Sequence, residues 1–248
     1  MMRFIEKPNL PAGKARMVIC GELCSELIGF LRSREIELVF ISPNSSIDPA
    51  TANHADMAAL HLGTDNIIVD GNQTSLIDKL RSIGFDVTPT VNVIAGEYPC
   101  DCALNFTVVS NYIIGRLSSA DSNLLEKAER YSKLDLKQGY CKCSCLVLNE
   151  KALITDDTTI HKKCLENGFD CLLIAKGDVS LPGHEYGFIG GASAKISESE
   201  VLFFGDITKH RDYKKIADFI EKYGCEIISL DFPLTDFGGM IPIIEETP

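Results

Sequence analysis

The stretch that decides the fold is residues 184–231, HEYGFIGGASAKISESEVLFFGDITKHRDYKKIADFIEKYGCEIISLD. An apolar run at 188–193 leads through a polar turn into a second apolar run at 201–204, and the two together predict a hairpin. Apolar residues then recur at helical spacing over 213–220. A last apolar run at 227–230 predicts a returning strand. The stretch therefore predicts one complete unit, made of a hairpin, a helix and a strand.

The same order of elements recurs along the rest of the chain. The helix exits are alike in three units, and they read IGFDV from Ile83, NGFDC from Asn167 and YGCEI from Tyr223. Spacings of about 40 to 50 residues separate successive central strands, a period typical of repeat architectures. These strands are expected to begin near Met17, Asn66, Tyr112, Ala152 and Val201.

Two architectures are compatible with alternating strands and helices. An open, doubly wound parallel sheet is one of them. An extra strand in the units and the lack of a GxGxxG loop after any strand count against it. We therefore expect one α/β domain over residues 1–248, a five-bladed α/β-propeller built from five ββαβ repeats with pseudo-fivefold symmetry. The repeats are expected at approximately 15–45, 54–92, 100–140, 141–178 and 184–243.

The composition restricts the classes of partner. Hydrophobic residues make up 45% of the 248 residues, and the formal net charge is −11. Nucleic-acid binding needs clustered Lys and Arg, which this chain lacks, so we expect no nucleic-acid partner. No apolar run approaches the roughly 20 residues that a membrane helix needs. Residues 1–20 contain no signal-peptide pattern, so we expect a cytoplasmic protein whose ten cysteines are reduced. The oligomeric state stays open.

Five ββαβ units on a chain of this length resemble the pentein fold of the guanidine-modifying enzymes, which include arginine deiminases and amidinotransferases. The chain is most similar to an uncharacterised branch of that fold, which also has a non-enzymatic member. The resemblance implies a site at the mouth of a central channel, with an early carboxylate, a middle His-x-Asp and a late Cys. In such a site carboxylates bind the guanidinium, the thiolate attacks its carbon and the histidine transfers protons.

Three segments carry parts of that pattern. His54-Ala-Asp56 is a His-x-Asp, placed directly before a strand expected at 57–62. His184 and Glu185 lie near the position that the resemblance implies for the middle histidine, with Tyr186 in place of the aspartate. The C-terminal segment 234–243, LTDFGGMIPI, resembles the Gly-rich segment that holds the nucleophile. It supplies Asp236, Gly238 and Gly239 as candidate substrate-binding residues, but Met240 and Ile241 stand where the cysteine is expected.

Two groups of cysteines precede the first strands of the third and fourth units. If both segments are extended, alternate thiols share a face, and the five could meet at the channel. Three interpretations stay open: a thiolate metal site, a relocated nucleophile activated by His54 or His184, and small side chains that fill tight space. CxC spacing is not the CxxC spacing of zinc sites, so we expect no metal and no cofactor. The five are Cys100, Cys102, Cys141, Cys143 and Cys145.

The sequence thus predicts a hydrolase or amidinotransferase-like enzyme for a small cationic guanidino or amidino compound. Asp56, Glu185 or Asp236 would hold the cation. A thiol (Cys102, Cys143 or Cys145) would attack, with His184 or His54 as acid and base. The alternatives are a non-catalytic binding or assembly protein of the same fold and a thiolate metal-binding protein.

Overall fold

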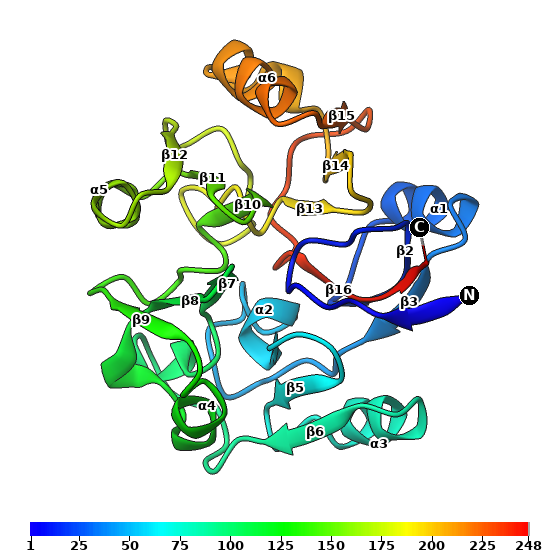
Figure 1. The fold of residues 1–248 in the computed structure, drawn as a ribbon, viewed down its shortest axis with the longest axis vertical. Helices are drawn as coiled ribbons and strands as arrows, with labels where there is room; N and C mark the ends of the chain where they lie inside the picture. The colour runs from blue at the N-terminus through cyan, green and yellow to red at the C-terminus, as the bar shows by residue number, and fades with distance from the viewer. Residues whose placement is uncertain (248) are drawn as a thin grey trace.

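Residues 1–247 of the computed structural model form five small sheets arranged around a centre, with the main helices on the outside (Figure 1). Four of the sheets have the same plan, in which the first two strands pair antiparallel and the second and third pair parallel. The α/β fold with small sheets is thus the one the sequence predicts, while the pseudo-fivefold symmetry stays a prediction.

The second and third sheets follow each other along the chain. The second consists of β4 (Ala59–His61), β5 (Asn66–Val69) and β6 (Asp86–Pro89). In the chain, α2 (Ala55–Ala58) precedes β4, and α3 (Thr74–Ser82) connects β5 to β6. The third consists of β7 (Thr107–Val109), β8 (Tyr112–Gly115) and β9 (Ser132–Asp135), with η1 (Cys100–Cys102), η2 (Leu117–Ser119) and α4 (Ser122–Lys127).

The fourth and fifth sheets continue the pattern. The fourth consists of β10 (Cys145–Asn149), β11 (Ala152–Thr155) and β12 (Asp170–Leu173), with α5 (Thr158–Glu166). The fifth consists of β13 (Ser193–Lys195), β14 (Glu200–Phe203) and β15 (Glu226–Ile228), with η3 (Ile207–Lys209) and α6 (Tyr213–Lys222).

The first sheet is completed by the end of the chain. It contains β1 (Met2–Phe4), β2 (Ala15–Cys20) and β3 (Glu37–Phe40), with α1 (Ser25–Ser33) between the last two. Strand β16 (Met240–Glu246) inserts between β1 and β2 and pairs antiparallel with both. In Figure 1 this red strand lies beside the blue N-terminal strands. Residues 240–243, which the sequence groups with the fifth unit, therefore belong to the first sheet.

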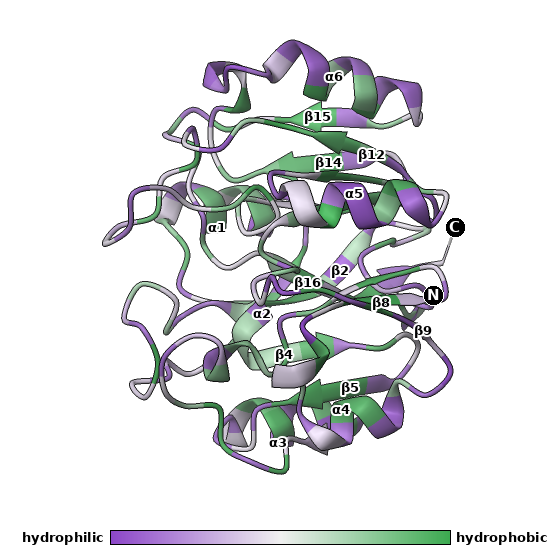
Figure 2. Cartoon of the chain, turned by 90° about the vertical axis from the view of Figure 1, so that its left-hand side faces the viewer, coloured by the Kyte–Doolittle hydropathy of each residue, from purple (hydrophilic) through white to green (hydrophobic). Residues whose placement is uncertain are grey.

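Local sequence explains most of these elements. The central strands β5, β8, β11 and β14 are buried beyond their first residues because they consist largely of Ile, Val and Leu. Helix α6 buries Ile216, Phe219 and Ile220 on one face, as its apolar spacing predicts. Figure 2 shows the same division, with hydrophobic strands inside and hydrophilic outer helix faces. Of the helices in residues 1–247, none is both long and apolar enough to cross a membrane.

The core consists of five buried apolar clusters, each of which joins two neighbouring sheets. One cluster joins the first and second sheets through Ile19, Val69 and Ile243. The others join the second to the third, the third to the fourth, the fourth to the fifth, and the fifth back to the first. Because burial of apolar surface is the main stabilising contribution, the ring is held together between its sheets as well as within them.

Candidate active site

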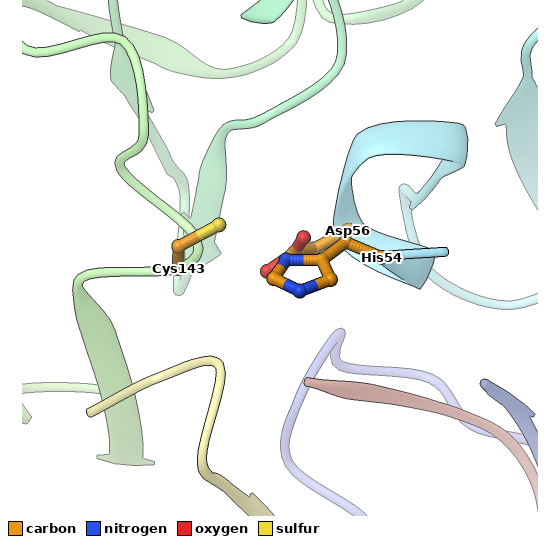
Figure 3. Close-up of side chains that lie close together, drawn as sticks. All are labelled: His54, Asp56 and Cys143. Carbon is orange, nitrogen blue, oxygen red and sulfur yellow. The ribbon is translucent and has the colours of Figure 1, made fainter. Parts of the chain in front are cut away.

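Three buried side chains from different parts of the chain meet near the centre of the ring. His54 precedes the short helix α2, Asp56 lies in its first turn, and Cys143 lies in the turn before β10. One ligand atom of each lies within 4.8 Å of the other two. Figure 3 shows the imidazole and the carboxylate side by side, with the thiol facing them. The relative exposure of each residue is 4% or less.

Asn105 holds two of these segments together. Its side-chain amide donates to the Cys143 sulfur (3.0 Å) and to the Asp56 carbonyl (3.2 Å). Its side-chain oxygen accepts from the backbone nitrogens of Lys142 (2.8 Å) and Cys143 (3.3 Å). Asn105 is fully buried, so these bonds replace its contacts with water. Asn105 is not among the site residues expected from the sequence, although a polar side chain within the apolar run at 103–109 is a signal for it.

The Asp56 carboxylate is buried, and the charges of His54 and Lys142 together with the Cys143 thiol offset only part of the effect of burial on its pKa. Neither of its oxygens has a hydrogen-bond partner, and the Nδ1 atom of His54 has none either. Burial raises the pKa of Asp56 to about 6, although the nearby His54 and Lys142 act in the opposite direction. Buried polar groups normally find partners, so three unpaired atoms in one place indicate a site prepared for a further group.

Burial also acts on the thiol. It raises the pKa of Cys143 well above the usual value, and the carboxylates of Asp56 and Asp236 raise it further. The sulfur is therefore a neutral thiol at neutral pH when no cation lies beside it. A nucleophilic or metal-binding sulfur must be a thiolate, so either function needs a positive charge to enter the site.

Asp236 forms the next part of the site. Its carboxylate accepts from the backbone nitrogens of Phe188 (2.9 Å) and Gly238 (2.8 Å). One oxygen also lies 3.8 Å from Nδ1 of His54. Because a Cβ on Gly191 would come within 1.9 Å of an Asp236 oxygen, glycine at position 191 is what lets this carboxylate lie there.

A cavity of about 280 Å³ opens above His54, Cys143 and Asp236. Tyr140, Tyr186 and Phe188 form an aromatic wall along it, and the ring of Phe188 packs against both tyrosines. A second cavity, of about 430 Å³, lies on another side of His54 and Asp236. Asp56 does not line either cavity and lies behind the residues that do. The aromatic wall is not among the features expected from the sequence.

The other predicted residues lie around this centre. His184 and Glu185 line the same cavity at its exposed side. The Nε2 atom of His184 lies 3.2 Å from a carboxylate oxygen of Asp48, so this histidine pairs with the opposite loop rather than with a thiol. Gly238 has a φ of +77° and packs on His54, and Gly239 donates its backbone N–H to the carbonyl of Gly191.

The two cysteine segments are not extended, so the condition under which their alternate thiols would share a face is not met. Residues 100–102 form η1, and residues 141–144 form turns before β10. Turns rotate successive side chains in different directions, so the alternation of a strand is lost. Over residues 1–247, the trio of His54, Asp56 and Cys143 is the sole close group of three or more potential metal ligands, and the five thiols do not converge.

The remaining cysteines have other surroundings. Cys102 donates to a carboxylate oxygen of Asp101 (3.2 Å), and Cys100 is exposed. Cys141 and Cys145 are buried in the apolar cluster between the third and fourth sheets. Burial raises the pKa of all three buried thiols, Cys102, Cys141 and Cys145. These positions fit space-filling side chains, and Cys143 differs from them in facing the cavity beside a histidine.

Comparison with known proteins places the chain in a family. Residues 18–241 match the Family of unknown function (DUF6873). The chain belongs to this family. No curated protein sequence matches it.

Solved structures of low sequence identity share its fold. An amidinotransferase from Microseira wollei in the saxitoxin biosynthetic pathway has a TM-score of 0.62 at 12% identity, over 97% of this chain and 96% of that chain. Inosamine-phosphate amidinotransferase from Streptomyces griseus has a TM-score of 0.57 at 9% identity, over 96% of each chain. Dimethylarginine dimethylaminohydrolase from Pseudomonas aeruginosa, solved with citrulline, has a TM-score of 0.55 at 12% identity, over 88% of this chain and 92% of that chain. This chain therefore has the pentein fold of the guanidine-modifying enzymes.

Proposed function

We propose that this protein is a thiol-dependent enzyme that acts on a small cationic guanidino or amidino compound. The observation that carries the proposal is the meeting of a thiol, an imidazole and a carboxylate within 4.8 Å, with Cys143 and His54 lining a cavity. Three of the solved structures that share the fold are named as amidinotransferases or as a dimethylarginine hydrolase.

The cavity suits a planar cation. Asp236 and Glu185 line it with carboxylates, and Tyr140, Tyr186 and Phe188 line it with aromatic rings. Carboxylates bind guanidinium and amidinium groups through paired N–H bonds, and aromatic faces attract cations. Asp56, which lies behind the lining, adds negative charge without contacting the substrate. A small cation is therefore the ligand that this lining would select.

The bound cation would also activate the thiol. Its positive charge opposes the effect of Asp56 and Asp236 on Cys143 and favours the thiolate. The Cys143 S–H proton passes to His54, and the sulfur forms a bond to the central carbon of the substrate. His54 returns the proton to the departing amine as the C–N bond breaks. Water or a second amine then attacks the amidino carbon, and the thiol is restored.

This site differs from the one that the resemblance implies. The resemblance places the nucleophile in the C-terminal Gly-rich segment, where this chain has Met240, a buried residue of the cluster between the fifth and first sheets. In our proposal the nucleophile lies before the fourth sheet, and His54 before the second. The same groups would thus act from different positions around the ring.

Turnover of a substrate panel tests the proposal. Arginine, methylated arginines, agmatine and simple amidines would be incubated with the protein, and ureido products, ammonia and released amines measured. Cys143→Ser should reduce turnover by at least about a thousandfold, the usual scale for loss of a nucleophile. Cys102→Ser, which removes another buried thiol, should retain it. Equal turnover in the Cys143→Ser variant and the original protein would refute the assignment.

A non-catalytic binding protein is the second candidate. The raised pKa of Cys143 favours it, because the thiol stays neutral when no cation lies beside it. Under this alternative, guanidino compounds would bind in the cavity and be released unchanged. Calorimetric binding in the absence of any turnover, with similar affinity in Cys143→Ser, would select this candidate over the enzyme.

A further inference from the structure

Three unpaired polar atoms of the central trio raise the free energy of the folded protein. His54 Nδ1 and both Asp56 oxygens are buried without hydrogen-bond partners. An unsatisfied buried polar group costs on the order of 1–3 kcal/mol, and more when it is charged. The neighbouring sulfur of Cys143 faces the same point. A group that contacts one ligand atom of each of the three residues would reduce this cost.

We propose that His54, Asp56 and Cys143 form a binding site for a divalent metal ion of intermediate softness, Zn²⁺ in particular. The site offers one imidazole nitrogen, one carboxylate and one sulfur. Zinc accepts all three ligand types, whereas calcium and magnesium prefer oxygen. Three protein ligands leave a fourth tetrahedral position free, and here that position would face the cavity beside His54 and Cys143.

The three ligand atoms lie only slightly farther apart than zinc binding requires. Bond lengths of about 2.0–2.3 Å place the ligand atoms of tetrahedral zinc roughly 3.3–3.8 Å apart. The three atoms here lie within 4.8 Å of one another, so movements of about 1 Å, as side-chain rotations allow, would complete the site. Asn105 already holds the sulfur through a 3.0 Å hydrogen bond, which is the kind of outer contact that orients metal ligands.

The charges balance on binding. The Cys143 S–H bond breaks, the sulfur bonds to the metal, and one proton leaves for solvent. A divalent ion then meets one thiolate and one carboxylate, and Asp236 nearby adds further negative charge. Lys142, which lies close to Asp56, opposes the ion and limits its affinity.

Ion binding would control the chemistry of the same site. The sulfur cannot hold a metal and attack a substrate carbon at the same time, so the ion and the cationic substrate exclude each other. This consequence rests on the proposed function, whereas the binding site itself does not. In a metal-bound resting form, a chelator would remove the ion and free the thiol for the substrate.

Cobalt and zinc binding test the proposal on the full chain. The protein would be stripped with a chelator, dialysed and titrated with Co²⁺, with the thiolate-to-cobalt absorption in the near ultraviolet as the readout. We expect one ion per chain, displaced by Zn²⁺. Cys143→Ala should abolish the absorption and weaken binding by at least about a hundredfold, above the usual effect of losing an outer contact. Cys102→Ala should bind as the original protein does.

Controls keep the outcomes separate. His54→Gln leaves the thiol in place and should also weaken binding, which guards against misfolding specific to Cys143→Ala, and circular dichroism checks both variants. Absence of binding to the original protein, or unchanged binding in Cys143→Ala, would overturn the metal site. Turnover by the stripped protein is measured independently. Zinc binding without turnover would refute only the proposed enzyme activity. Turnover without zinc binding would refute only the proposed metal site.

Discussion

Gly238 lies directly against His54. A Cβ on Gly238 would come within 2.3 Å of the His54 Cα, closer than atoms pack in proteins. The Gly238 carbonyl also accepts from the backbone nitrogen of Asp56 (3.2 Å), and its own N–H donates to Asp236. The segment just before the closing strand β16 therefore positions the histidine, and the site depends on closure of the ring.

The first prediction compares Gly238→Ala with Gly168→Ala. Both glycines have positive φ, +77° and +80°, so both variants should lose about 1–2 kcal/mol of stability from backbone strain, and Gly238→Ala should lose more because its Cβ would collide with His54. Gly168 has no atom within 4 Å of an added Cβ, whereas Gly238 has His54. Only Gly238→Ala should therefore displace the imidazole and reduce turnover, by about tenfold or more. Urea unfolding and turnover assays check this. Equal turnover in the two variants would show that Gly238 does not position His54.

The second prediction concerns Asp236→Asn. The carboxylate accepts two backbone N–H bonds, and an amide of the same shape can accept only through its oxygen. We expect a loss of about 1.5–3 kcal/mol in the free energy of unfolding, the scale for hydrogen bonds to charged groups. Binding of a guanidino compound should weaken at least about tenfold, because a unit charge near 5 Å contributes about 3 kcal/mol at an effective dielectric constant of 20.

Asp178→Asn is the matched control for that variant. Asp178 pairs with the exposed Arg211 on the surface, and such pairs contribute about 0–1 kcal/mol. Calorimetry should find its affinity for guanidino compounds unchanged. An Asp236→Asn variant that binds as tightly as Asp178→Asn would remove Asp236 from the proposed site.

The third prediction is a fall in stability in mild acid caused by His61. Burial lowers the pKa of this histidine to about 4, and its Nε2 bonds the Thr64 carbonyl (2.9 Å). The unfolded chain takes up a proton near pH 6.5, and the folded protein only near pH 4. The free energy of unfolding should therefore drop by about 3 kcal/mol as the pH falls between these values.

His61→Gln isolates this contribution. Glutamine can keep the bond to Thr64 but does not titrate, so the variant should lose less stability than the original protein between pH 6.5 and 4. Chemical denaturation at a series of pH values measures the difference. Parallel curves for the two proteins would mean that folding does not lower the pKa of His61.

The fourth prediction concerns closure of the ring by β16. Ile243 is fully buried in the cluster between the first and second sheets. Ile243→Ala should destabilise the protein by about 2–5 kcal/mol, the usual cost of truncating a large core side chain. Val91→Ala, at a position that is 58% exposed, should change stability by less than about 0.5 kcal/mol. Similar midpoints for the two variants in denaturant would argue that β16 does not contribute to the core.

Local signals predict most of the fold. The central strands β5, β8 and β11 begin at Asn66, Tyr112 and Ala152, the positions expected from turn residues and apolar runs. The strand expected at 57–62 is shorter, because residues 55–58 form α2 and β4 begins at Ala59. Pairing of β16 with β2 joins opposite ends of the chain, and no local pattern in the sequence contains that information.

The site is less predictable for the same reason. Position in the sequence singled out His54, Asp56 and Asp236, but nothing in CxC spacing distinguishes Cys143 from Cys102. That distinction depends on turns that aim one thiol at a histidine from another sheet. Asn105 and the aromatic wall likewise acquire their roles only when the segments before the second, third, fourth and fifth sheets come together.

Charge-selective alkylation of Cys143 tests the central claim most directly. Protein stripped of metal ions with a chelator would be treated with 2-chloroacetamidine, a cationic amidine, or with neutral chloroacetamide. Labelled peptides would then be quantified by mass spectrometry. The exposed Cys100 gives the intrinsic ratio of the two rates. The account predicts that Cys143 prefers the amidine by at least about tenfold more than Cys100 does, since carboxylates surround the sulfur, and that His54→Gln reduces its labelling. An equal ratio at the two cysteines, or no labelling of Cys143, would contradict it.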